Sequence, residues 1–103
     1  MVKITKTIAD ERLANIPPGK QFWCSDGCEL KNLTELKAAL ERMDEETFRY
    51  HSNEAKSDFS NWVGDVIGDE KLSRDLRKST TSAEAAKSVA SRITWLRSKM
   101  AGA

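Results

Sequence analysis

The chain has 103 residues, of which 39% are hydrophobic and 32% are charged, and its formal net charge is +1 at pH 7. This length is enough for one domain with a modest apolar core, without disulfides or metal ions to hold it together. No apolar run approaches the roughly 20 residues of a membrane helix, which argues against a membrane protein. The N-terminus also lacks the long apolar segment of a signal peptide, so we expect a cytoplasmic protein.

The charges are distributed unevenly along the chain. Residues 22–70 hold twelve acidic and five basic side chains, whereas residues 71–103 hold eight basic and two acidic ones. Opposite charges in two parts of one chain usually neutralise each other when the chain folds. The same pattern is also compatible with a head-to-tail contact between copies of the chain, or with a basic surface that binds an acidic partner.

Residues 1–19 are predicted to form an N-terminal arm that precedes a single helical domain over residues 20–103. Three aliphatic residues between positions 8 and 16 are spaced for a short helix that can lie on the core. The sequence Pro17-Pro18-Gly19 then ends regular structure, because proline lacks a backbone donor and glycine favours turns.

Residues 21–30 (QFWCSDGCEL) contain two short runs of β-forming residues around Ser25-Asp26-Gly27. Gly27 can adopt a positive φ, which the third loop position of a three-residue hairpin turn requires. Phe22 and Trp23 should point to opposite faces of this hairpin, since successive strand side chains alternate.

Two helices are expected next. Asn32 can cap the first, with Glu35 three residues later in a capping-box arrangement. Asp44 begins a shorter helix anchored by Phe48, and its first turn is acidic, where the helix dipole favours anions. The apolar face of the first helix comprises Leu33, Leu36, Leu40 and Met43.

The segment from Ser57 to Leu72 (SDFSNWVGDVIGDEKL) has the strongest helical pattern in the chain. Five large apolar residues recur at i, i+3, i+4, i+7 and i+8, which places them on one face of a helix. Ser57 or Asp58 is expected to cap its start, and Gly68 to end it in the left-handed conformation. We predict that this is the central core helix, with an apolar face made of Phe59, Trp62, Val63, Val66 and Ile67.

The rest of the chain predicts two more helices. Asp69 caps a short one, and Thr81 or Ser82 caps a long one that extends to Met100. Trp95 lies roughly 130° from the apolar stripe of the last helix, at 100° per residue. This stripe comprises Ala86, Val89, Ile93, Leu96 and Met100. The predicted fold class is therefore mainly α, a compact domain of about five or six helices with one small β-hairpin near residues 21–30.

A set of ordered positions between Phe22 and Leu76 carries a resemblance to a known family. These positions are Phe22, Asp26-Gly27, Asn32-Leu33, Glu35-Leu36, Phe48, Tyr50-His51, Asn53, Asp58-Phe59, Trp62-Val63, Val66, Gly68-Asp69 and Leu72. The pattern resembles a family of small helical domains of unknown function in archaea and bacteria, which occur standalone or appended to larger proteins. The resemblance implies a compact helical domain and implies no activity.

Cys24 and Cys28 form a C-x3-C pair around the predicted turn. Reduced thiols, a cross-strand disulfide and a metal site are three open interpretations of this pair. Structural zinc normally takes four ligands, and Cys24, Cys28 and His51 supply only three, so these residues are weak candidates for a metal or thiol site. We predict no metal and no cofactor.

His51 is the single histidine of the chain and lies in a polar cluster with Tyr50 and Asn53. One interpretation is that His51 and Asn53 satisfy backbone groups in the connection between helices. The other is a small binding patch with Asp58 opposite, which would sense pH if His51 donated to a buried carboxylate. Because the sequence has no nucleophile-elbow motif, we predict no catalytic residues and a protein that is not an enzyme.

Trp95 is the residue that most favours a protein partner. Together with Arg92 and Lys99 it forms our candidate partner-binding set, because tryptophan and arginine are typical of contact hot spots. The alternative is that the N-terminal arm or the hairpin covers Trp95. The sequence favours a non-enzymatic protein–protein interaction module, whose partner is an unidentified protein or a second copy of the chain.

Nucleic-acid binding by the basic C-terminal third is the second candidate function, with Trp95 as a stacking residue. The basic residues of the last helix spread around its polar arc instead of forming one stripe along the helix. No DNA- or RNA-binding signature accompanies them. A metal or thiol function at Cys24 and Cys28 is the third candidate.

Overall fold

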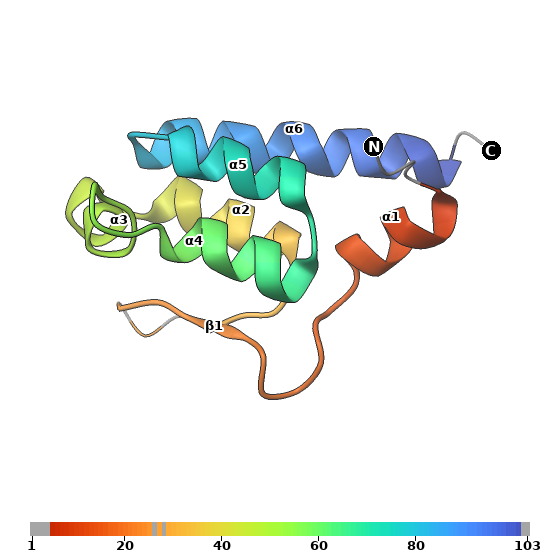
Figure 1. Ribbon diagram of the computed structural model, residues 1–103, viewed down its shortest axis with the longest axis horizontal. Coiled ribbons are helices and arrows are strands. Elements are labelled where there is room, and N and C mark those ends of the chain that lie inside the picture. The colour runs from red at the N-terminus through yellow and green to blue at the C-terminus, as the bar shows by residue number, and fades with distance from the viewer. Residues whose placement is uncertain (1–4, 26, 28, 102–103) are drawn as a thin grey trace.

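The structure is a computed structural model that describes residues 5–25, 27 and 29–101. It is mainly α-helical with one two-stranded hairpin, which confirms the predicted fold class (Figure 1). The longest helix runs along the long axis of the molecule, the hairpin lies on the opposite side, and shorter helices fill the space between them. In chain order the elements are α1 (Lys6–Leu13), β1 (Phe22–Trp23), β2 (Glu29–Leu30), α2 (Leu33–Arg42), α3 (Glu45–His51), α4 (Asp58–Trp62), the π-helix η1 (Val63–Ile67), α5 (Glu70–Lys78) and α6 (Ser82–Ala101).

Helix α6 is the element against which much of the molecule packs. Helices α1, α2 and α5 all contact it. The apolar stripe predicted for it is confirmed, because Val89, Ile93 and Leu96 are buried and Met100 packs against the core from its edge. The first helix of the chain is therefore held against the last one.

Side-chain caps begin three helices at the predicted residues. Asn32 Oδ1 accepts a hydrogen bond from the backbone N–H of Glu35 at 2.8 Å. Asp44 and Asp69 accept equivalent bonds from the residues three positions further on, at 2.8 and 3.0 Å. The capping box differs from the expected arrangement in one hydrogen bond. The Glu35 carboxylate accepts from the N–H of Lys31 at 2.7 Å and not from that of Asn32. Local sequence thus decides where these helices begin.

The start of α6 combines a local cap with a tertiary contact. Thr81 Oγ1 accepts from the N–H of Glu84 at 3.1 Å and is the capping residue. The hydroxyl of Ser82 instead donates to Glu45 Oε1 at 2.8 Å, and the same oxygen accepts the N–H of Ser82 at 3.2 Å. A carboxylate at the start of α3 therefore fixes the first turn of α6, where the helix dipole favours a negative charge.

The hairpin has the predicted position and orientation. Its strands pair antiparallel, with Phe22 opposite Leu30 and Trp23 opposite Glu29. Phe22 is buried and Trp23 is 62% exposed, which confirms that the two aromatic rings point to opposite faces. Gly27 has a φ of +94°, as expected for the residue that closes the turn.

The predicted core helix is divided into two segments of different winding. Helix α4 continues into η1, in which the N–H of Gly68 bonds to the carbonyl of Val63 at 2.8 Å, five residues back. Gly68 has a φ of +85° and ends the segment, as predicted. Val63 is buried, but Val66 and Ile67 are only partly buried, because the wider π-turn changes the directions of the later side chains.

The prediction that Ser57 or Asp58 caps this helix is wrong. The N-cap residue Ser57 makes no capping hydrogen bond with its side chain. The carboxylate of Asp58 lies instead beside His51 and Lys56, each at 3.1 Å. Asp58 therefore contacts side chains outside its helix and does not cap the first turn of that helix.

A buried serine pair joins α4 to α5. Ser60 Oγ donates to the carbonyl of Ser73 at 2.7 Å, and Ser73 Oγ donates to the carbonyl of Ser60 at 2.8 Å. A Cβ atom on Gly64 would lie 3.0 Å from Ser73 Oγ, so only glycine fits there without displacing this hydroxyl. The small residues allow the two helices to lie close together.

The N-terminal arm and the residues just after it contact the rest of the molecule at several places. Helix α1 contacts α6, and Ala9 is completely buried between them and the rest of the core. Further on, the indole N–H of Trp62 donates to the carbonyl of Lys20 at 2.8 Å. This bond fixes the segment that follows the two prolines.

Candidate functional site

Trp95 lies on the surface of α6, at the edge of the packed helices. Its side chain is 38% exposed, so neither the arm nor the hairpin covers it fully. The Arg92 guanidinium carbon lies 4.4 Å from the ring centroid, and Lys99 Nζ lies 4.9 Å from it. These residues are one turn before and one turn after Trp95, at the spacing that lets helical side chains meet. The three residues of the predicted partner-binding set therefore lie in contact with one another on α6.

Arg92 has a structural contact in addition to its contact with Trp95. It is only 9% exposed, and its Nε donates to Asp69 Oδ2 at 2.7 Å. Asp69 is fully buried, and the same oxygen lies 3.6 Å from a guanidinium nitrogen of Arg12. We call Arg12, Asp69 and Arg92 the Asp69 cluster. It joins α1, the start of α5 and α6, and it holds Arg92 in place beneath the ring of Trp95.

A groove runs between α5 and α6 beside Trp95. It has a volume of about 580 Å³ and is lined by Lys71 and Asp75 from α5 and by residues of α6 that include Lys87, Ser91 and Trp95. Lys71 pairs with Asp75 across one turn of α5. The groove thus offers one partly exposed aromatic ring together with an excess of basic groups.

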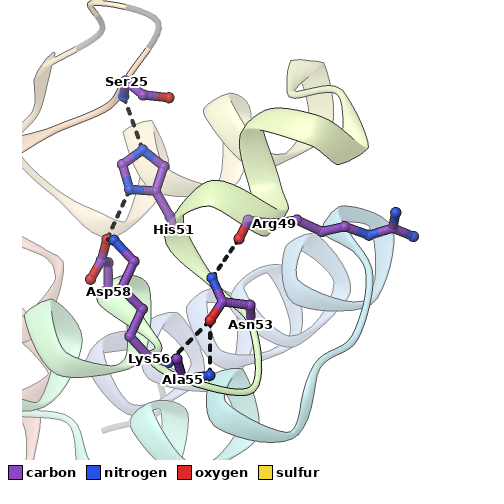
Figure 2. Close-up of polar contacts among 7 residues, drawn as sticks. All are labelled: Ser25, Arg49, His51, Asn53, Ala55, Lys56 and Asp58. Carbon is purple, nitrogen blue, oxygen red and sulfur yellow. Dashed lines mark hydrogen bonds and ion pairs between the residues drawn. The ribbon is translucent and has the colours of Figure 1, made fainter.

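A second polar arrangement surrounds His51 at the end of α3 (Figure 2). The ring is only 4% exposed, and both of its nitrogens have partners. Nε2 accepts the backbone N–H of Ser25 at 2.9 Å, and Nδ1 lies 3.1 Å from Asp58 Oδ2. Lys56 Nζ contacts the same carboxylate oxygen at 3.1 Å. We call Ser25, His51, Lys56 and Asp58 the His51 cluster.

These contacts confirm the structural interpretation for Asn53 and confirm it only in part for His51. Asn53 donates to the carbonyl of Arg49 at 2.8 Å and accepts from the N–H groups of Ala55 and Lys56, at 2.9 and 3.3 Å (Figure 2). His51 also accepts a backbone N–H, but this N–H belongs to the hairpin and not to the connection between the helices. The expected proximity of Asp58 to His51 is also confirmed. The sequence did not indicate Ser25 as a partner, because that contact spans 26 residues.

The candidate metal ligands are only partly within the described residues. Cys28 and its relation to Cys24 lie outside them, so the three interpretations of the cysteine pair stay open. Cys24 is buried in the apolar core. Both nitrogens of His51 are already hydrogen-bonded. Within the described part of the chain, no three His, Cys, Asp or Glu side chains are grouped so as to hold a metal ion.

The arrangement around His51 resembles half of a catalytic triad, since a carboxylate orients an imidazole. In a triad, however, the second nitrogen faces a nucleophilic side chain. Here that nitrogen accepts a backbone N–H, and the ring is buried. This geometry positions the hairpin and leaves no acceptor on the ring for a substrate proton.

No family model, no curated protein and no solved structure matches this chain. The family resemblance of residues 22–76 therefore stays a prediction. Among the helices within residues 5–101, none is long and apolar enough to cross a membrane.

Proposed function

We propose that this protein is a non-enzymatic interaction module that binds an acidic segment of a protein partner along α5 and α6. The observation that carries the proposal is the position of Trp95, partly exposed beside a groove and in contact with Arg92 and Lys99. A large ring that is fixed before binding loses little conformational entropy when a partner contacts it. Tryptophan is also enriched among the residues that dominate binding energies.

Charge complementarity supports an acidic partner. Residues 71–103 contain eight basic and two acidic side chains. The Lys87 and Lys99 side chains are exposed on α6 near the groove and near Trp95. Glutamate and aspartate side chains of a partner would meet these ammonium groups, and an apolar residue between them would contact the indole. Such electrostatic pairing mainly favours the rate and specificity of association.

Protein binding fits this surface better than nucleic-acid binding. Arg92 forms an ion pair with buried Asp69, and Lys71 forms one with Asp75. These contacts neutralise part of the positive charge that a phosphate backbone would require. Arg92 and Lys99 also already contact the ring on which a base would have to stack. The cytoplasmic location expected from the sequence is part of the same proposal.

The test compares three tagged proteins on extract of the native cells: the wild type, Trp95→Ala and the matched control Trp23→Ala. Trp23 is the more exposed ring and belongs to the hairpin. We expect a stoichiometric protein to be retained by the wild type and by Trp23→Ala, and lost with Trp95→Ala. Its binding region should map to an acidic segment, and replacing the acidic residues there by their amides should weaken binding about tenfold.

Thermal unfolding supplies the control on stability. Trp95→Ala should cost about 1 kcal/mol or less, because its contacts with Arg92 and Lys99 are cation–π contacts at a partly exposed site. A large loss would show that Trp95 belongs to the core and would contradict the proposal. Nuclease-sensitive material that salt releases from the wild type would support nucleic-acid binding instead, and retention of a second copy would support self-association.

A further inference from the structure

His51 connects three segments that are separate in the sequence. From the end of α3 its Nε2 reaches the hairpin loop at Ser25, and its Nδ1 reaches Asp58 at the start of α4 (Figure 2). Its ring also lies 5.2 Å from the ring of Phe22 on β1 and 5.3 Å from that of Phe59 on α4. His51 therefore contributes one aromatic contact and one hydrogen bond to the packing of the hairpin on the helices.

The two hydrogen bonds fix both the charge and the tautomer of the ring. A backbone N–H can only donate, so Nε2 must carry a lone pair opposite Ser25. The remaining proton is then on Nδ1, which donates to the carboxylate of Asp58. A protonated imidazole has two N–H donors and no acceptor. The observed contacts therefore require neutral His51.

The groups that face His51 act on its two nitrogens differently. Asp58 from α4 lies on the Nδ1 side, and Lys56 from the preceding loop shares the same carboxylate oxygen. Tyr50 of α3 contacts the ring edge-on, with centroids 5.0 Å apart. On the hairpin side, the contact is the amide of Ser25, next to the titratable residue Cys24. An added proton on the ring is thus attracted to Asp58 but opposed by the amide of Ser25.

We infer that protonation of His51 releases the hairpin loop from the helices while the contact between α3 and α4 remains. The proton comes from solvent and binds Nε2, so the N–H of Ser25 loses its acceptor and faces a second donor. Nδ1 keeps its proton, and its bond to Asp58 becomes an ion pair. Phe22, which stacks on Phe59 at 5.1 Å and lies edge-on to Trp62 at 5.9 Å, would then become more exposed. This inference does not depend on the proposed function at α5 and α6.

Amide hydrogen exchange measured by NMR tests the inference between pH 8 and pH 5, the range in which histidine ordinarily changes charge. The ring C–H signals of His51 follow its protonation in the same samples. We expect the protection factor of Ser25, corrected for the intrinsic effect of pH on exchange, to fall about tenfold as His51 becomes protonated. Amides in the middle of α6, such as that of Val89, should keep their protection.

His51→Gln is the matched variant, because its side-chain oxygen can accept the N–H of Ser25 and does not titrate. In this variant the protection of Ser25 should not depend on pH. Constant protection in the wild type while His51 titrates would overturn the inference, and so would the same loss in His51→Gln. A histidine that stays neutral until the helices themselves unfold, as followed by circular dichroism, would also overturn it.

Discussion

The Asp69 cluster and the His51 cluster both attach a segment from the N-terminal third of the chain to helices that follow it in the sequence. In the Asp69 cluster a fully buried carboxylate holds Arg92 at 2.7 Å and Arg12 at 3.6 Å. In the His51 cluster a buried imidazole accepts the amide of Ser25 and contacts the carboxylate of Asp58. The first joins α1, α5 and α6, and the second joins the hairpin, α3 and α4.

The two clusters differ in how they respond to their surroundings. The guanidinium groups of the Asp69 cluster stay protonated at any pH at which a protein is folded. The imidazole of the His51 cluster belongs to the residue type that changes charge near neutral pH. Helix α1 and the hairpin, both in the N-terminal third of the chain, are thus attached by chemically different groups. One attachment depends on guanidinium groups, and the other on an imidazole whose protonation we infer to release the hairpin loop.

The largest expected loss of stability comes from breaking the Asp69 cluster. Asp69→Ala removes the cap of α5 and leaves the buried guanidinium of Arg92 without its carboxylate. The loss of one partner of a buried ion pair typically costs about 3–5 kcal/mol. Unfolding by denaturant, followed by circular dichroism, measures the change in the free energy of unfolding.

Asp75→Ala is the control for this prediction, since it breaks an exposed ion pair on the same helix. Its cost should be about 0.5 kcal/mol or less. If Asp69→Ala does not fold, Asp69→Asn keeps a capping oxygen and should give an intermediate stability. Equal stabilities of Asp69→Ala and Asp75→Ala would contradict the structural role of the cluster.

A smaller loss of stability is expected from changes in the His51 cluster, measured at pH 8. His51→Ala leaves the N–H of Ser25 without an acceptor and removes the ring between Phe22 and Phe59. An unsatisfied buried donor costs about 1–3 kcal/mol, and His51→Gln should recover part of this. Denaturant unfolding of the two variants measures the difference. Equal losses in both would show that ring packing, and not the hydrogen bond, attaches the hairpin.

The smallest expected change in stability concerns a helix cap outside both clusters, at Asp44. Hydrogen bonds from the backbone N–H and then the side chain of Thr47 lower the pKa of Asp44 from its usual 3.8. A lowered pKa stabilises the folded state above pH 3.8, and this contribution is lost as the pH falls through the folded-state value.

Asp44→Asn keeps the capping oxygen but cannot ionise. The stability advantage of the wild type over this variant should therefore shrink when the pH is lowered below 3.8, as acid unfolding curves would show. Glu54→Gln, at an exposed position of the loop before α4, is the control. A difference between wild type and Asp44→Asn that does not change with pH would contradict the prediction.

Much of the fold could be predicted from local patterns. The caps at Asn32, Asp44 and Asp69, the turn glycine Gly27 and the buried stripe of α6 all follow from residues close together in the sequence. The core helix was predicted only in part. Its apolar spacing is correct, but the spacing of apolar residues does not distinguish an α-turn from the π-turn of η1.

The candidate sites were less predictable than the fold. Sequence reasoning selected Trp95, Arg92 and Lys99 together, because residues one turn apart on a helix must be neighbours. It did not indicate that Arg92 pairs with Asp69, which lies 23 residues away. In the same way it identified Asp58 as a neighbour of His51 but not the hairpin amide at Ser25.

The sequence by itself determined the helices, most of their ends and the side of each that is buried, because these depend on contacts within one or two turns. Tertiary structure decided which distant partners several polar groups have. Asp58 was expected to cap its own helix and pairs with His51 and Lys56 instead. A buried polar group must find a partner, and which group lies within reach depends on how distant segments pack. The hydrogen bond between Ser25 and His51 therefore depends on how the hairpin packs against α3.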